Sequence, residues 1–252
     1  MIRNSLLIAF ILAVSSGPSL ADEALPSARS LVDAHIEAAG GRDAIEAQAD
    51  STMTGRLRMP SAGLEGQLKL VSRQPGERVM QVELPGIGTI QSGYRDGTAW
   101  SVDPFMGPRL IEGQELAAQV EANEIGAILR SEEYVESMET VEQREYDGQA
   151  CYAVEVRWKS GRESLDCYAV DSGLLLASES TEQSPMGEME TVMIFSDYQR
   201  FGDSLLPALT RLRTMGQEQH IVIDSVEFGP PEAANFELPP AIVTLMSDNS
   251  AD

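Results

Sequence analysis

The chain has little of the side-chain chemistry that enzymes and metal sites use. Its 252 residues include only two histidines and two cysteines. It contains no His-Glu-x-x-His motif, no group of Cys and His at metal-ligand spacing and no Gly-x-Ser-x-Gly motif. His35 and His220 stand alone in their segments, where an isolated histidine is more often structural than catalytic. The sequence therefore predicts no catalytic residue, no metal site and no cofactor.

Basic residues are scarce relative to acidic ones. The chain has 18 Lys and Arg against 40 Asp and Glu, which gives a formal net charge of −22 at pH 7. No basic patch is visible, and this argues against nucleic acid and anionic lipid headgroups as partners of the surface. The acidic residues are spread along the chain, so two interpretations stay open. They either suit a saline habitat or steer the protein towards a basic partner.

Long apolar runs are absent except at the N-terminus. Arg3 precedes an apolar run over residues 6–14, which is too short to span a bilayer, and Ser19 and Ala21 supply small residues before a cleavage site after Ala21. This pattern predicts a signal peptide over residues 1–21 and a periplasmic protein without stable membrane insertion; the alternative is a retained anchor helix. We expect one domain over residues 22–246 and a disordered polar tail over 247–252.

The two cysteines, Cys151 and Cys167, lie in one predicted hairpin. Residues 151–158 and 163–170 alternate between apolar and polar, and Gly161 lies in the turn between them. Both cysteines have the same parity relative to the turn, so they share one face of the hairpin. An oxidising compartment favours a disulfide between them; the alternative is two free thiols that pack as small hydrophobic side chains.

The remaining pattern is mainly β. A helix is predicted over residues 27–39, from the N-cap Ser27 to the stop at Gly40-Gly41, and a helical segment over 112–128. Elsewhere apolar residues recur with a period of two. The predicted strands cover residues 52–59, 64–70, 80–84, 87–94, 98–102, 138–146, 150–158, 163–170, 174–182, 189–198, 206–215 and 219–228.

About a dozen strands with short turns predict a mainly β (α+β) fold. We expect a strongly curved antiparallel sheet that forms an incomplete β-barrel of about 11–12 strands, with helices covering its mouth. The loop over residues 103–108 places Phe105 near this mouth. Residues 230–240 are expected to form an irregular arm that packs back through Phe236 and Leu238.

The most distinctive side chains are apolar. Methionines fall in several predicted strands, and unbranched thioethers suit a surface that adapts to variable apolar ligands. The alternative is that these residues form ordinary core. The candidate residues that line an apolar cavity are Met53, Leu57, Leu68, Leu70, Met80, Val82, Trp100, Phe105 and Met193.

Several short segments carry a resemblance to a known family. They are residues 38–46, 83–88, 146–152 and 184–188, together with Trp100 and residues 106–109. On these segments the chain resembles the LolA/LolB-like periplasmic proteins that sort outer-membrane lipoproteins. The resemblance implies an incomplete β-barrel whose helices close an apolar cavity for acyl chains.

Two functions remain open at this stage. The first is a periplasmic carrier that binds lipid or an acylated lipoprotein, without catalysis. The second is a non-catalytic structural module of the cell envelope with a filled core, which binds an envelope protein through its acidic surface or a free strand edge.

Overall fold

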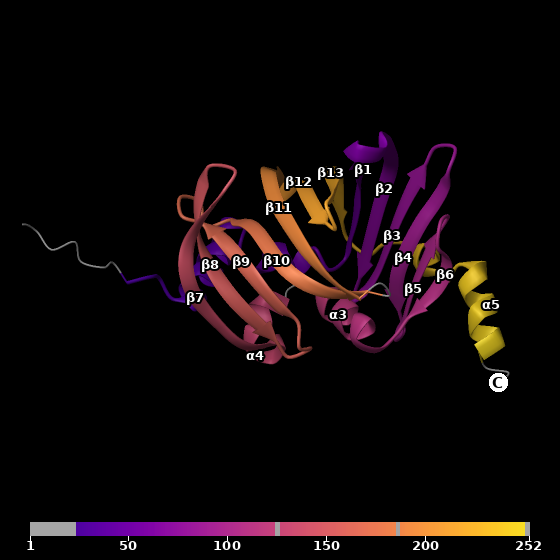
Figure 1. Ribbon diagram of the computed structural model, residues 1–252, viewed down its shortest axis with the longest axis horizontal. Coiled ribbons are helices and arrows are strands. Elements are labelled where there is room, and N and C mark those ends of the chain that lie inside the picture. The colour runs from indigo at the N-terminus through magenta and orange to yellow at the C-terminus, as the bar shows by residue number, and fades with distance from the viewer. Residues whose placement is uncertain (1–23, 124–126, 185–186, 250–252) are drawn as a thin grey trace, which may run out of the picture.

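The structure is a computed structural model that describes residues 24–123, 127–184 and 187–249, so the predicted signal peptide lies outside it. Thirteen antiparallel strands form one strongly curved sheet, and within the described residues no pairing joins its two edges (Figure 1). The strands are β1 (Ser51–Met59), β2 (Leu64–Arg73), β3 (Glu77–Leu84), β4 (Gly88–Arg95), β5 (Thr98–Asp103), β6 (Gly107–Ile111), β7 (Val135–Tyr146), β8 (Gln149–Trp158), β9 (Glu163–Ala169), β10 (Leu175–Ser184), β11 (Gly187–Phe201), β12 (Ser204–Thr214) and β13 (Gln217–Phe228). The predicted mainly β, incompletely closed fold is confirmed.

The strand order explains where the helical interruption lies. Two meanders, β1 to β6 and β7 to β13, meet at the centre of the sheet, where β1 pairs with β13. Strands β6 and β7 are consecutive in the chain but form the two opposite edges. The segment between them therefore has to pass from one edge of the open sheet to the other. The two meanders form the two arms of the curved sheet, β1 to β6 and β7 to β13. Figure 1 shows α3 of this segment between these arms.

Short helices make up most of the rest. The helices are α1 (Ala28–Ala38), α2 (Arg42–Ala47), η1 (Pro60–Ala62), α3 (Gly113–Asn123), η2 (Ala127–Arg130), α4 (Ser131–Tyr134), η3 (Ala233–Phe236) and α5 (Pro240–Asn249). Of the helices in the described ranges, none is long and apolar enough to cross a membrane.

The sheet has two faces, which we name by what packs on them. Helix α1 packs against the side of β8 that carries Val154, Val156 and Trp158, and we call this side the inner face. Cross-strand pairing carries the same side across the sheet to Leu68 and Val82. The opposite side, which η3 and α5 cover over β3, β5 and β6, is the outer face.

Helix α1 forms and ends as its sequence predicts. Ser27 caps it by accepting a hydrogen bond from the backbone N–H of Ser30 at 3.2 Å. Gly40 ends it with a φ of 115°, and a Cβ at Gly40 would lie 2.2 Å from the backbone oxygen of Asp203. This glycine therefore both stops the helix and lets the turn between β11 and β12 approach it closely.

The centre of the sheet bends at Gly55. The register between β1 and β13 shifts between Thr54 and Gly55, which marks a β-bulge. A Cβ at Gly55 would lie 1.9 Å from the backbone oxygen of Val222. Only a residue without a side chain permits this close approach, so Gly55 contributes to the curvature that opens the inner face.

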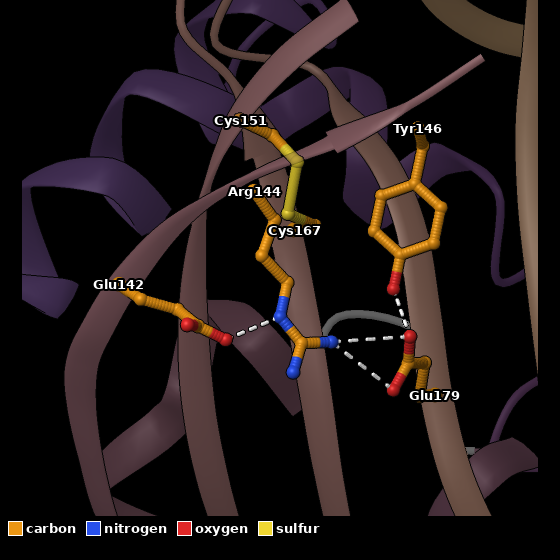
Figure 2. Close-up of a disulfide and its surroundings, with 6 residues drawn as sticks. All are labelled: Glu142, Arg144, Tyr146, Cys151, Cys167 and Glu179. Atoms are coloured by element: carbon orange, nitrogen blue, oxygen red, sulfur yellow. Dashed lines mark hydrogen bonds and ion pairs between the residues drawn. A yellow bond between two sulfur atoms is a disulfide. The ribbon is translucent and has the colours of Figure 1, made fainter. Parts of the chain in front are cut away.

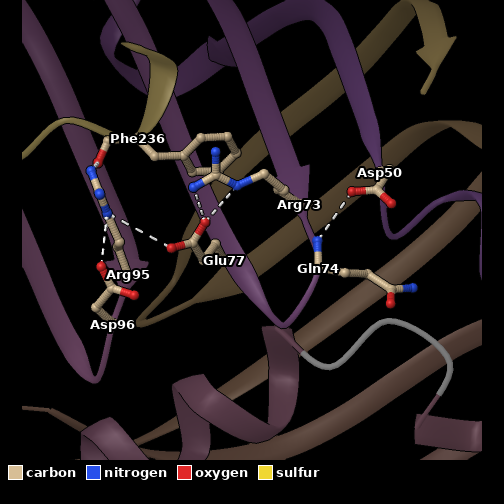
Figure 3. Close-up of polar contacts among 7 residues, drawn as sticks. All are labelled: Asp50, Arg73, Gln74, Glu77, Arg95, Asp96 and Phe236. Atoms are coloured by element: carbon tan, nitrogen blue, oxygen red, sulfur yellow. Dashed lines mark hydrogen bonds and ion pairs between the residues drawn. The ribbon is translucent and has the colours of Figure 1, made fainter. Parts of the chain in front are cut away.

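The C-terminal arm is anchored on the outer face by a buried carboxylate. Glu77 accepts hydrogen bonds from Arg73 and lies 3.7 Å from Arg95, which donates to the backbone oxygen of Phe236 at 3.0 Å (Figure 3). The guanidinium of Arg73 also stacks 4.3 Å above the Phe236 ring. The predicted packing of Phe236 and Leu238 is confirmed, because both join the core under the arm.

Two elements differ from the expectations. The sheet has thirteen strands rather than about 11–12, because Gly107–Ile111 forms the edge strand β6. Five residues are too few to display alternation, and Pro108 is tolerated because β6 pairs on one side only. The sequence does not indicate helix α5, because its first residue, Pro240, ends a run that looks irregular; proline at the first helical position is in fact favourable. This helix runs past Met246, where the sequence suggests a polar tail.

Candidate functional site

The inner face of β1 to β4 is a continuous apolar surface. Leu68 lies opposite Gly55 on one side and Val82 on the other, and Leu57 lies opposite Ile221. The surface consists of the buried Leu57, Leu68, Val82 and Leu84, with the partly buried Met59, Met80, Ile87, Ile90, Ile221 and Ile223. The partly buried members leave this surface accessible along its margin.

Most of the predicted cavity residues lie on this one face. Strand pairing places Met53, Leu57, Leu68, Leu70, Met80, Val82 and Met193 on the inner face. The period of two in β1, β2 and β3 is sufficient to bring the first six together. Met193 reaches the same face from β11, on the other side of the central junction.

Trp100 and Phe105 lie elsewhere. Trp100 pairs with Gly93 on the outer face and is fully buried in the core beneath Phe236 and Ile242. Phe105 is 70% exposed in the turn between β5 and β6. The structure therefore does not bring these two residues to the apolar inner surface.

Helix α3 lies across the inner face and is held at both ends by ion pairs. It contacts β4 on one arm and β10 on the other. Near its start, Arg109 of β6 donates to Glu115 at 2.6 and 2.9 Å. Near its end, Arg162 donates to Glu121 at 2.8 Å, and Glu121 is only 7% exposed. Helix α3 therefore bridges the two arms on the inner side of the sheet.

The inner face becomes polar towards β9 and β10. Ser178 donates to the Asp166 carboxylate at 2.6 Å, and Trp158 donates from Nε1 to Ser164 at 3.1 Å. Burial raises the pKa of the Asp166 carboxyl, an effect that the hydrogen bond from Ser178 opposes. Arg162 stacks 4.3 Å above the Trp158 ring. This polar cluster lies where α3 meets the second arm.

One inner-face residue escapes the sequence prediction. Arg78 lies on β3 directly opposite Ser72 on β2 and Tyr94 on β4. Its parity is the same as that of Met80 and Val82, so the sequence does contain a signal for it. The prediction missed Arg78 because it began this strand at Met80, whereas β3 begins at Glu77.

The two histidines occupy separate structural positions. The Nδ1 atom of His35 accepts a hydrogen bond from the backbone N–H of Leu175 at 3.2 Å, which ties α1 to β10. Burial lowers the pKa of His35 to about 4, and a backbone hydrogen bond at Gly173 opposes this effect. His220 lies 2.6 Å from Glu218 on β13. Their positions fit the structural interpretation of isolated histidines.

The predicted disulfide is present, on the outer face. Cys151 lies opposite Ala169 and Cys167 lies opposite Ala153, so the two cysteines are diagonal neighbours, with Cα atoms 5.5 Å apart. Figure 2 shows a polar group beside it, in which Glu179 accepts from Tyr146 and from Arg144. The Arg144 Nη1 to Glu179 Oε1 distance is 3.3 Å. These contacts link β7 to β10 across the intervening hairpin.

The outer face also carries an acidic groove of about 570 Å³ across β7 to β11. Its floor is the backbone of these strands, and most of the side chains that line it point outward by parity. The charged residues of this acidic groove are Glu139, Glu155, Arg157, Glu163, Glu179 and Glu190. It is separate from the apolar inner surface.

The fold is an open antiparallel sheet whose two arms are bridged by a helical segment on the inner side. No protein-family model and no curated protein matches the chain. Among solved structures, it is similar to a LolA superfamily protein from Nitrosomonas europaea, with a TM-score of 0.51 and 13% identity over 85% of this chain and 99% of that one. The fold is therefore LolA-like, as the resemblance in sequence implies.

Two further solved structures are similar at the same level. A domain assigned to the outer membrane lipoprotein-sorting proteins of Vibrio parahaemolyticus gives a TM-score of 0.52 and 12% identity over 83% of this chain and 95% of that one. A DUF1329 family protein from Desulfovibrio piger gives a TM-score of 0.53 and 14% identity over 83% of this chain and 96% of that one.

Proposed function

We propose that this protein binds the acyl chains of lipids or lipoproteins on its inner face and carries them through the periplasm, without chemistry on the ligand. The observation that supports this most directly is the continuous apolar surface on the inner face of β1 to β4. Burying an acyl chain contributes roughly 0.8 kcal/mol per methylene, so a twelve-carbon chain offers on the order of 10 kcal/mol before the costs of binding. Such a site requires shape and apolar area rather than catalytic groups.

In this proposal the inner-face residues contact the acyl chain. They are Met53, Leu57, Leu68, Leu70, Met80, Val82 and Met193. Helix α3 closes over the chain, while α1 fills the other arm with side chains of its own. The signal peptide over residues 1–21 would direct the protein to the periplasm, and a lipoprotein-sorting partner in the envelope would receive the ligand.

Native mass spectrometry tests the proposal first. The mature protein purified from a periplasm is expected to carry a stoichiometric lipid or acylated peptide, which organic extraction then identifies. An apo mass that stays unchanged after incubation with lipids would overturn the carrier function.

A matched pair of variants locates the site. Ile90 and Gln91 are neighbours on β4, but Ile90 faces the apolar inner surface and Gln91 faces outward. Ile90→Asp is expected to abolish the bound lipid, because a carboxylate on the inner face loses its hydration when the chain binds. Gln91→Asp should retain the lipid. Equal retention of lipid in both folded variants would show that the inner face is not the binding site.

A second candidate function rests on the acidic groove. Five carboxylates and one guanidinium line it, which favours a cationic segment of an envelope protein as partner. In this case the protein is a non-catalytic interaction module with a filled core. Partner binding would then weaken steeply with salt, and the purified protein would contain no lipid.

A further inference from the structure

Arg78 lies at the polar end of the apolar inner surface. Along β3, Arg78, Met80 and Val82 point to the inner face in succession, followed by Leu84. Residues two apart on a strand are separated by roughly 6.6 Å, so Arg78 and Leu84 lie about 20 Å apart along one continuous stripe. The stripe is apolar everywhere except at Arg78.

The row of residues that contains Arg78 is polar, and within the described chain its side chains are not paired with other side chains. Ser72, Arg78 and Tyr94 are direct neighbours on β2, β3 and β4. Across the described ranges, none of their three side chains has a hydrogen bond or ion pair to another residue of the protein. By contrast, Arg56, Arg58, Arg73, Arg95 and Arg109 on neighbouring strands each pair with a carboxylate.

An unpaired guanidinium in this position is unfavourable for the protein alone. Burial lowers the pKa of Arg78, with no charged partner to compensate. A half-buried charge without a partner costs free energy, and natural proteins retain such costs mainly at functional sites. Arg78 remains partly accessible, so a ligand on the inner face would reach it.

We propose that Arg78 binds the acidic headgroup of the amphiphile whose acyl chain lies on the apolar inner surface. The planar guanidinium matches a carboxylate or a phosphate through two parallel hydrogen bonds, and the hydroxyls of Ser72 and Tyr94 supply further donors beside it. This inference rests on the proposed function and specifies its ligand as an apolar chain with an anionic end. A preference for an anionic ligand opposes the negative net charge of the protein, so it has to come from the local guanidinium of Arg78.

Binding of three twelve-carbon probes tests the inference. Laurate and dodecyl phosphate carry an anionic end, whereas dodecanol presents the same chain with a neutral end. The wild-type protein is expected to bind both acids roughly 30-fold more tightly than dodecanol, in keeping with a hydrogen-bonded charge pair. Arg78→Met should reduce the affinity for the acids to that for dodecanol and leave dodecanol unaffected. Arg56→Met, on the outer face, is the control and should change none of the three.

The outcomes separate this inference from the proposed function. Equal affinity of the wild-type protein for laurate and dodecanol, or unchanged laurate binding in Arg78→Met, would overturn the headgroup site while the carrier function stands. Binding of none of the probes would overturn both. Inorganic phosphate is a fourth probe, and phosphate binding that Arg78→Met abolishes, without any binding of laurate, would assign the site to a free anion. Arg78→Lys retains the charge and should retain part of the preference for acids.

Discussion

The indole of Trp100 occupies the space that a side chain at Gly93 would need. The two residues are direct neighbours on β5 and β4, and a Cβ at Gly93 would lie 2.4 Å from Cζ2 of Trp100. Phe236 and Ile242 complete the core around the ring. The outer face is therefore closed by a packing arrangement that depends on the absence of one side chain.

Gly93→Ala is expected to destabilise the protein by about 1–3 kcal/mol, because the buried indole has to move for the added methyl group. Urea unfolding monitored by tryptophan fluorescence measures the change. Trp100→Leu removes the clash, so the two substitutions combined should cost less than the sum of each alone. Strict additivity would contradict the packing relationship.

Breaking the ion pair between Arg162 and Glu121 should loosen α3 without unfolding the sheet. Arg162→Gln leaves the buried Glu121 carboxylate without its guanidinium. The amide hydrogen exchange rates of residues 113–123 are therefore expected to rise roughly tenfold. Exchange in β1 and β2, which Arg162 does not contact, should stay unchanged. Hydrogen exchange with mass spectrometry measures both segments.

Arg157→Gln is the matched control for this experiment. Arg157 pairs with Glu163 at 2.8 Å between β8 and β9, but both side chains are exposed, so the pair contributes little. Its loss should leave α3 exchange as in the wild type. The same increase in both variants would mean that α3 is not held by the pair with Glu121.

Glu77 should be essential for the packing of the C-terminal arm. Glu77→Gln leaves Arg73 and Arg95 facing a neutral amide in a mostly buried site, and a loss of about 3 kcal/mol is expected. Limited proteolysis should then cut residues 229–249 faster. Glu65→Gln, which removes the exposed partner of Arg58, serves as the control and should cost less than about 1 kcal/mol. Equal protease resistance in both variants would show that the arm docks without Glu77.

The sequence predicts the inner face well because its signal is local. In β1, β2 and β3 a period of two alone places Met53, Leu68 and Val82 on one side. Trp100 shows where this local reasoning stops. Its face depends on the register that the Asp96-Gly97 turn imposes, which pairs Trp100 with Gly93. Asp-Gly between two strands is a hairpin signal, but it does not by itself say which face of the sheet Trp100 occupies.

The remaining features of the candidate site depend on contacts between segments that are distant in the sequence. Nothing local in Glu121 indicates that it pairs with Arg162, which lies 41 residues further along the chain. Arg78 is conspicuous only once Ser72 and Tyr94 are known to be its neighbours and to offer it no carboxylate. The apolar surface could therefore be predicted from the sequence, whereas the ion pairs that hold α3 and the unpaired guanidinium could not.

Protonation of His35 should make the protein less stable in mild acid. Burial lowers the pKa of His35 from 6.5 to about 4, so between these values the unfolded chain takes up a proton that the folded protein does not. The contribution of His35 to stability is complete above pH 6.5 and falls by up to about 3 kcal/mol as the pH drops to 4. His35→Gln retains an acceptor for the N–H of Leu175 but does not titrate. The difference in unfolding free energy between the wild type and His35→Gln, measured by urea unfolding at pH 7 and at pH 4.5, should therefore shift against the wild type. Parallel pH dependence of the two proteins would show that His35 titrates alike in the folded and unfolded states.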